Sequence, residues 1–286
     1  MESPIRCLLP YITGRFENTY KGFSQYVQTL IDQQKVDPQI CLDNTDKFAS
    51  PVSMPSFGKI IMNEPFMCAL WSFCYYYFVI HEEYVVPYYN ECKSVKKQIL
   101  DEAEKLFQWG KSLKNGYCCW PQDLPMPTQH VRKFYVNLVN QIFLYAMNYI
   151  MCHEFAHIVK APQKGTSVEK EQEADGVAFD WLLKGRDGKN DFTIYLGIIM
   201  GLASLVVLNP DIKDSPSHPN SISRLDAFMK RINLEETHTL WCITTIVLHD
   251  WNMRNDYEFV FPKESDTFKS RYEEMMGIIK NQTRNV

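Results

Sequence analysis

Hydrophobic residues recur at helical spacing through most of the second half of the chain. Apolar positions repeated every three or four residues predict helices over about 131–159, 167–184, 192–208, 220–233 and 237–249. Further upstream, apolar residues at the same spacing among charged ones predict an amphipathic surface helix over 91–113, which Asn115 and Gly116 would end.

The first half of the chain has a less regular pattern. Prolines interrupt the first 60 or so residues, which favours short elements with one helix around residues 20–34. Residues 66–80 form an apolar, aromatic run that suits a buried strand or a buried helix. The proline-rich stretch 118–127 predicts an extended connector.

These patterns predict a mainly α fold, with α+β possible and mixed short elements in the N-terminal region. We expect a single domain over residues 1–286. The connector also allows a subdivision into an N-terminal region, 1–127, and a helical region, 128–286.

Two apolar runs, 66–80 and 195–208, raise the question of a membrane. Both are shorter than the roughly 20 residues that a helix needs to cross a bilayer. We therefore expect buried core elements and no transmembrane segment, while peripheral membrane association stays open.

Charge and cysteine content narrow the partners and the compartment. The 30 basic and 34 acidic residues are interspersed and give a net charge of -4, without the basic stripe that nucleic acid would need. The nine cysteines are irregularly spaced and the N-terminus lacks a secretory pattern, which predicts a cytoplasmic protein. The adjacent Cys118 and Cys119 are expected to be buried thiols.

The segment His153-Glu-Phe-Ala-His157 is an HExxH motif inside the helix predicted over 131–159. At 100° per residue the two histidines lie about 40° apart on one helix face, as two ligands of a single ion require. Glu154 is turned aside by about 100°, near the ion but free to act on its water.

The helix predicted over 167–184 offers a third ligand. A capping box from Thr166 to Glu169 marks its start. Glu169, Glu171 and Glu173 compete for the role, but only Glu171 shares the apolar face, where a carboxylate needs a partner or a metal. Asp175, one turn further, is placed to accept the free ring N–H of a ligand histidine.

A third feature is Ser217-His218-Pro219, with Pro219 at an early position of the helix that carries Arg224. His218 could steady a developing oxyanion, although a His–Pro pair at a helix start is more often only a cap. Arg224 could anchor the loop or a carboxylate.

Together, His153-Glu-Phe-Ala-His157, Glu171-Gln-Glu-Ala-Asp175 and Ser217-His-Pro with Arg224 resemble gluzincin peptidases. More closely, they resemble the Lit family of phage-exclusion peptidases, as does the stretch Trp120-Pro121. The resemblance implies a zincin-like helical core in a soluble bacterial or prophage-encoded peptidase. It also implies cleavage of the host elongation factor Tu, provoked by a phage capsid-derived peptide that engages the factor.

We therefore expect His153, His157 and Glu171 to bind Zn²⁺ and Glu154 to act as the general base in peptide hydrolysis. Zinc is inferred from ligand type, since imidazole and carboxylate ligands also suit other divalent metals. Three alternatives stay open: a related peptidase embedded in a membrane, a gluzincin that cleaves another regulatory protein such as a repressor, and a metal-stabilised binding protein without catalysis.

Overall fold

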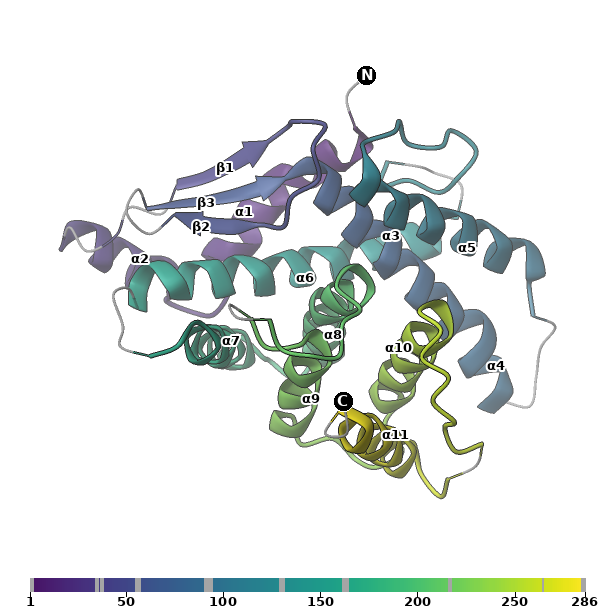
Figure 1. The fold of residues 1–286 in the computed structure, drawn as a ribbon. Coiled ribbons are helices and arrows are strands. Elements are labelled where there is room, and N and C mark those ends of the chain that lie inside the picture. The colour runs from purple at the N-terminus through teal and green to yellow at the C-terminus, as the bar shows by residue number, and fades with distance from the viewer. Residues whose placement is uncertain are drawn as a thin grey trace.

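Helices dominate the computed structural model of this chain, with one small sheet beside them (Figure 1). It describes residues 3–33, 36, 39–54, 58–89, 95–128, 132–160, 165–215, 218–263 and 265–283. The α-helices are α1 (Leu9–Glu17), α2 (Phe23–Asp32), α3 (Glu64–Ile80), α4 (Val86–Tyr89), α5 (Lys97–Ser112), α6 (Lys133–Lys160), α7 (Ser167–Lys184), α8 (Asp191–Leu208), α9 (Ser221–Arg231), α10 (Thr239–Arg254) and α11 (Phe268–Thr283). Shorter helical segments are η1 (Pro4–Leu8), the π-helix η3 (His81–Val85) and η4 (Leu113–Asn115). The predicted mainly α fold is confirmed.

Helix α6 is the central element and packs against α1, α3, α7 and α8. Buried side chains occur on all its faces, from Tyr135 to Ile158. A helix that is apolar all round has to lie in the core, because no face of it suits water. In Figure 1 the sheet lies on one side of α6, and α7, α8 and α9 lie on the other.

The two apolar runs form α3 and α8. Every residue of α3 from Glu64 to Val79 is buried. Its start is fixed by Asn63, whose side chain accepts a hydrogen bond from the backbone N–H of Phe66 at 3.1 Å, and by Pro65 in the first turn. The open choice between strand and helix for 66–80 is thus settled as helix.

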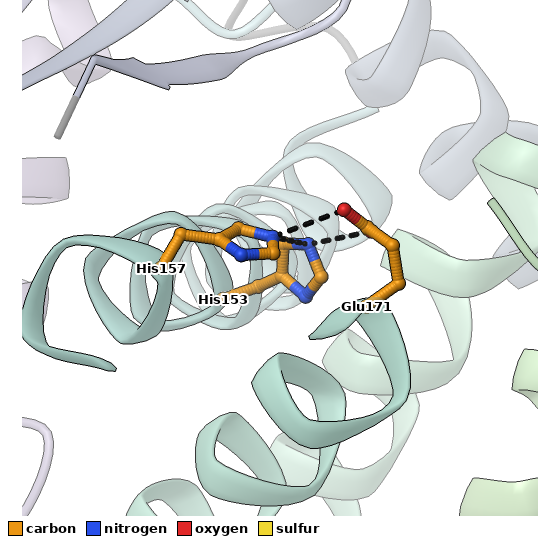
Figure 2. Close-up of side chains that lie close together, drawn as sticks. All are labelled: His153, His157 and Glu171. Atoms are coloured by element: carbon orange, nitrogen blue, oxygen red, sulfur yellow. Dashed lines mark hydrogen bonds and ion pairs between the residues drawn. The ribbon is translucent and has the colours of Figure 1, made fainter. Parts of the chain in front are cut away.

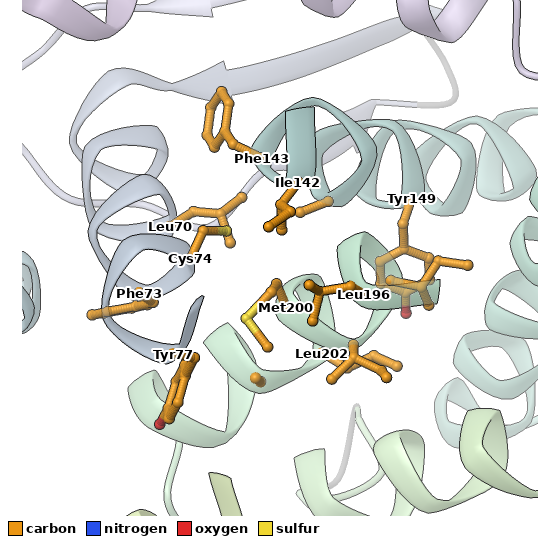
Figure 3. Packing of buried hydrophobic residues seen from close by; sticks show 14 of the residues in the cluster. Leu70, Phe73, Cys74, Tyr77, Ile142, Phe143, Tyr149, Leu196, Met200 and Leu202 are labelled. Carbon is orange, nitrogen blue, oxygen red and sulfur yellow. The ribbon is translucent and has the colours of Figure 1, made fainter. Parts of the chain in front are cut away.

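Helix α8 has the length and composition that could cross a membrane, but 78% of it is buried inside the protein. Side chains of α3, α6 and α8 meet in one cluster, with Leu70, Ile142 and Met200 among them (Figure 3). Both apolar runs are therefore core helices, as expected.

The sheet has three strands in the order β1-β3-β2, from β1 (Gln39–Asp43), β2 (Val52–Met54) and β3 (Lys59–Asn63). Strand β3 pairs in parallel with β1 and antiparallel with β2. β2 is an edge strand, and it contacts α6. The sheet therefore meets α6 through its edge strand β2.

Asn63 also fixes the loop between β1 and β2. Its side-chain amide donates to Asp43 Oδ2 at 3.0 Å and to the Lys47 carbonyl at 2.9 Å. Its side-chain oxygen accepts from the backbone N–H of Ala49 at 3.2 Å. The segment that leads into β2 is thus tied to the point where β3 becomes α3.

Most predicted helices are present with shifted ends. The predicted helix 91–113 begins only at Lys97, and residues 91–94 lie outside the described residues. Helices α1 and α11 and the sheet were not predicted. The prediction for Cys118 and Cys119 is wrong, because both are exposed on the connector while the neighbouring Trp120 is buried. The division into domains stays a prediction.

Candidate metal centre

Helix α6 carries His153 and His157 one turn apart on the same face. Their Nε2 atoms lie 3.1 Å from each other, and the two rings are nearly perpendicular. The His153 side chain is 8% exposed and that of His157 21% exposed. Two imidazole nitrogens thus point at one spot just below the protein surface (Figure 2).

Helix α7 brings Glu171 to the same spot. The predicted capping box starts the helix, since Thr166 and Glu169 exchange side-chain to backbone hydrogen bonds. Glu171 Oε2 lies 3.3 Å from His153 Nε2, and Glu171 Oε1 lies 3.2 Å from His157 Nε2. The structure therefore places the carboxylate beside both rings, as helical phase predicts.

The spacing of these atoms suits a single ion. One ligand atom from each of His153, His157 and Glu171 lies within 4.8 Å of the other two. Ligand atoms about 2.0–2.1 Å from a tetrahedral zinc ion lie roughly 3.3 Å from one another. The two Nε2 atoms are 3.1 Å apart, and the carboxylate meets His157 through Oε1 at 3.2 Å and His153 through Oε2 at 3.3 Å, distances of that size. Two imidazole nitrogens and a carboxylate gathered this closely form a donor set of the kind that binds a divalent cation.

Asp175 and Arg224 lie directly behind His153. Asp175 Oδ1 is 2.9 Å from His153 Nδ1, so it can accept a hydrogen bond from the Nδ1–H, which leaves Nε2 free for a metal. Arg224, on α9, donates to Asp175 through Nε at 2.8 Å and through Nη2 at 2.7 Å. Its Nη1 is also 3.8 Å from Glu171 Oε2. Arg224 thus anchors a carboxylate, one of its two predicted roles.

The electrostatics of this cluster favour a bound cation. Burial opposes ionisation of Glu171 and Asp175, but the histidines and Arg224 outweigh it and hold both carboxyl pKa values well below their usual range. Burial also disfavours a charge on His153, but Asp175 outweighs that effect and raises the His153 pKa to about 9. The two carboxylates thus favour a positive charge beside His153, which a bound cation could supply in place of the ring proton.

Glu154 lines a pocket of about 730 Å³ together with His153, His157 and Glu171. Its Oε2 accepts a hydrogen bond from the backbone N–H of Ser53 at 2.7 Å. That donor comes from the edge strand β2, whose residues Val52 and Ser53 also line the pocket. A carboxylate that is not one of the candidate ligands therefore lines the same pocket as those three residues.

His218 lies at the rim of this pocket. Its Nε2 is 3.7 Å from Glu171 Oε1, and its side chain is 57% exposed. The expectation for Pro219 is wrong in detail: α9 starts at Ser221 and Asn220 is its cap, so Pro219 precedes the helix. Ser217 lies outside the described residues. The structure brings His218 near the site but leaves it more accessible than the other residues.

Comparison with known proteins extends this description. The family model described as Peptidase U49 matches residues 60–244, more than half of the chain. The chain belongs to the peptidase U49 family. A relative named cell death peptidase, from Escherichia coli (strain K12), is 26% identical over an alignment of 204 residues. The match covers 64% of this chain and 65% of the relative. The chain thus spans about two thirds of that relative. No solved structure matches.

The peptidase U49 match confirms the resemblance to Lit-type peptidases. The matched range extends from β3 into α10 and includes every predicted site residue, from His153 to Arg224. Strands β1 and β2, with Ser53, lie outside it.

Two residues near the centre of this peptidase U49 member were missed by sequence reasoning. The Tyr149 hydroxyl donates a hydrogen bond to Asp175 Oδ1 at 2.7 Å. It lies one turn before His153, so the spacing 149, 153, 157 was a readable signal. Ser53 gave no such signal, because it reaches Glu154 through its backbone from a strand 101 residues away.

Proposed function

We propose that this chain is a zinc-dependent peptidase in which His153, His157 and Glu171 bind the ion and Glu154 is the general base. The observation that carries the proposal is the convergence of two imidazole nitrogens and one carboxylate within 4.8 Å of one another. The carboxylate of Glu154, next to His153 in sequence, lines the same pocket. Membership in the peptidase U49 family supports it.

The residues around the centre have distinct tasks in this proposal. Bound zinc would supply a Lewis acid that polarises the scissile carbonyl and lowers the pKa of a water molecule. Glu154 takes a proton from the attacking water and passes it to the leaving amine. The Ser53 N–H holds one oxygen of that carboxylate, which leaves the other for proton transfer. His218, at the rim, would donate a hydrogen bond to the developing oxyanion.

The metal assignment is tested by measuring zinc content and affinity. The wild-type chain is expected to bind one Zn²⁺. Glu171→Gln should weaken binding by more than the roughly 10- to 100-fold loss seen when a residue that merely supports a ligand is changed. Glu173→Gln is the matched control, because Glu173 lies on the same helix, is 41% exposed and pairs with Lys160. Equal losses in both variants would contradict the assignment of Glu171.

The role of Glu154 is tested separately. Glu154→Gln should bind Zn²⁺ as the wild type does, because Glu154 is not a ligand, and should cleave no substrate. Turnover in this variant at the wild-type rate would remove Glu154 from the role of general base.

We further propose that the chain acts in phage exclusion, an abortive infection, by cleaving host elongation factor Tu in the cytoplasm when a phage-derived peptide is present. The resemblance to Lit-type peptidases and the relative named cell death peptidase support this choice. The test is incubation of the purified protein with a bacterial lysate, with and without the peptide and a chelator. Fragments that appear only without chelator are then identified.

Each outcome of that incubation separates the candidate functions. Fragments of elongation factor Tu would support the proposed target. Fragments of another protein, such as a repressor, would keep the peptidase and replace the target. Stoichiometric Zn²⁺ with no cleavage of any protein, even with the phage-derived peptide, would favour a metal-stabilised binding protein.

A further inference from the structure

Tyr149 is almost completely buried behind the proposed metal centre, with 1% of its surface exposed. Its hydroxyl donates to Asp175 Oδ1 at 2.7 Å, the same oxygen that lies 2.9 Å from His153 Nδ1. Burial and the Asp175 carboxylate raise the Tyr149 pKa well above its usual value, so the hydroxyl stays protonated and remains a donor. Tyr149 therefore contacts the carboxylate that contacts the ligand.

The ring of Tyr149 is held between two other helices. It stacks on Phe179 of α7, with ring centroids 5.6 Å apart and planes 14° from parallel. On α8, a Cβ atom added at Gly201 would lie 2.7 Å from Tyr149 Cδ1, closer than such contacts allow. Figure 3 shows Tyr149 extending from α6 towards α8. The ring position is thus fixed by packing on both sides.

We propose that Tyr149 is a positioning residue of the metal centre, which holds Asp175 in the orientation that directs His153 Nε2 at the ion. Gly201 contributes to the same positioning, because its lack of a side chain leaves room for the Tyr149 ring. This inference rests on the proposed zinc site and adds two residues to it.

A purely structural role for Tyr149 predicts something different. A buried hydroxyl needs a partner, and Asp175 would satisfy it even if no metal were ever bound. In that case loss of the hydroxyl would destabilise the fold and leave metal affinity unchanged. If Tyr149 positions Asp175, metal affinity falls as well. The fall is moderate, because Arg224 still holds Asp175 through two hydrogen bonds.

The first test compares Tyr149→Phe with Tyr272→Phe. Tyr272, on α11, is the matched control, since it is only 2% exposed. Its hydroxyl also donates to a buried carboxylate, Asp226 Oδ1, at 3.0 Å. Zn²⁺ affinity is measured by competition with a chelator, and stability by urea unfolding of the metal-free protein. Both variants should lose stability. Only Tyr149→Phe should bind Zn²⁺ about tenfold more weakly, the lower end of the range for residues that support a ligand.

A second pair of variants keeps the hydroxyl and moves the ring. Gly201→Ala should push the Tyr149 ring and weaken Zn²⁺ binding. Gly277→Ala, where an added Cβ meets nothing within 4 Å, should leave it unchanged. The visible absorption of the Co²⁺-loaded protein should change in Tyr149→Phe and Gly201→Ala, because it reports ligand geometry, and in neither control.

The results separate this inference from the proposed function. Wild-type Zn²⁺ affinity and Co²⁺ spectra in Tyr149→Phe would overturn the inference, whether or not Gly201→Ala folds. If the wild-type chain itself binds no Zn²⁺, the proposed metal site is wrong and the inference is overturned with it.

Discussion

The ion pair between Asp175 and Arg224 can be tested by replacing Asp175 with Asn. Both side chains are more than nine-tenths buried, and the pair shares two hydrogen bonds of 2.7 and 2.8 Å. The Asn side chain keeps the shape of Asp175 but removes the charge. It also replaces one acceptor oxygen by an N–H donor. If Nδ2 takes the place of Oδ2, this donor faces the N–H of Arg224 Nε, and the hydrogen bond between them is lost.

The size of the effect follows from that burial. Breaking a buried ion pair by removing one partner costs about 3–5 kcal/mol, because the remaining charge stays buried without compensation. The lower end applies here, since Glu171 stays 3.8 Å from Arg224 and compensates part of its charge. A loss of about 3 kcal/mol corresponds to a fall in melting temperature of about 5 °C, because 286 residues unfold with an entropy of about 0.6 kcal/mol/K.

The assay is urea unfolding in the presence of chelator, so that metal binding does not contribute to stability. Asp175→Asn, Arg224→Met and the double variant complete a double-mutant cycle. The double variant should be more stable than the sum of the two single losses predicts, by about 1–3 kcal/mol, because it leaves no charge unpaired. Additive losses, or a loss below about 1 kcal/mol for Asp175→Asn, would refute the reasoning.

Two further predictions concern other parts of the chain. Ser53→Pro removes the N–H that donates to Glu154 and should lower kcat about tenfold without changing Zn²⁺ affinity. Ser53→Ala is the control, because it keeps the backbone N–H and should keep the wild-type kcat. A higher kcat in Ser53→Pro would contradict this and show that the hydrogen bond hinders Glu154 as a base. Burial opposes ionisation of Asp226, but Lys230 and Lys280 outweigh burial and hold the Asp226 pKa below the ordinary 3.8. The ionised carboxylate therefore stabilises the fold above pH 3.8, and this stabilisation is lost as the pH falls through the lowered pKa. In urea unfolding, Asp226→Asn should therefore differ from wild type by a constant amount above about pH 5 and by less below about pH 4; a difference that stays constant into acid would contradict this.

The sequence predicted best those features that depend on residues within a single helix. Helices α6 and α7 were predicted almost to the residue, because apolar periodicity and the capping box at Thr166 are local features. The same locality places Glu171 on the face that meets the histidines. Helix α11 could have been predicted in the same way, since its buried residues Tyr272, Met275, Met276 and Ile279 follow helical spacing.

Features that depend on distant pairing were not readable in the sequence. Strands β1 and β3 pair in parallel although their partners are 20 residues apart, as Gln39 with Lys59, and each strand is only five residues long. The contact of Ser53 with Glu154 arises only after that sheet is placed beside α6. An exposed connector explains Cys118 and Cys119, since thiol burial is a statistical preference that a surface loop overrides.

The hydrogen bonds of Asn63 link the chemistry of the pocket to a residue that touches no part of it. This side chain begins α3 and at the same time secures the loop that ends in β2. The position of β2 beside α6, and with it the width of the pocket in which the proposed peptidase would bind its substrate, therefore depends on Asn63 as well as on the residues that line the pocket. A change at Asn63 is therefore expected to move β2, while the proposed ligands His153, His157 and Glu171 stay in place on α6 and α7.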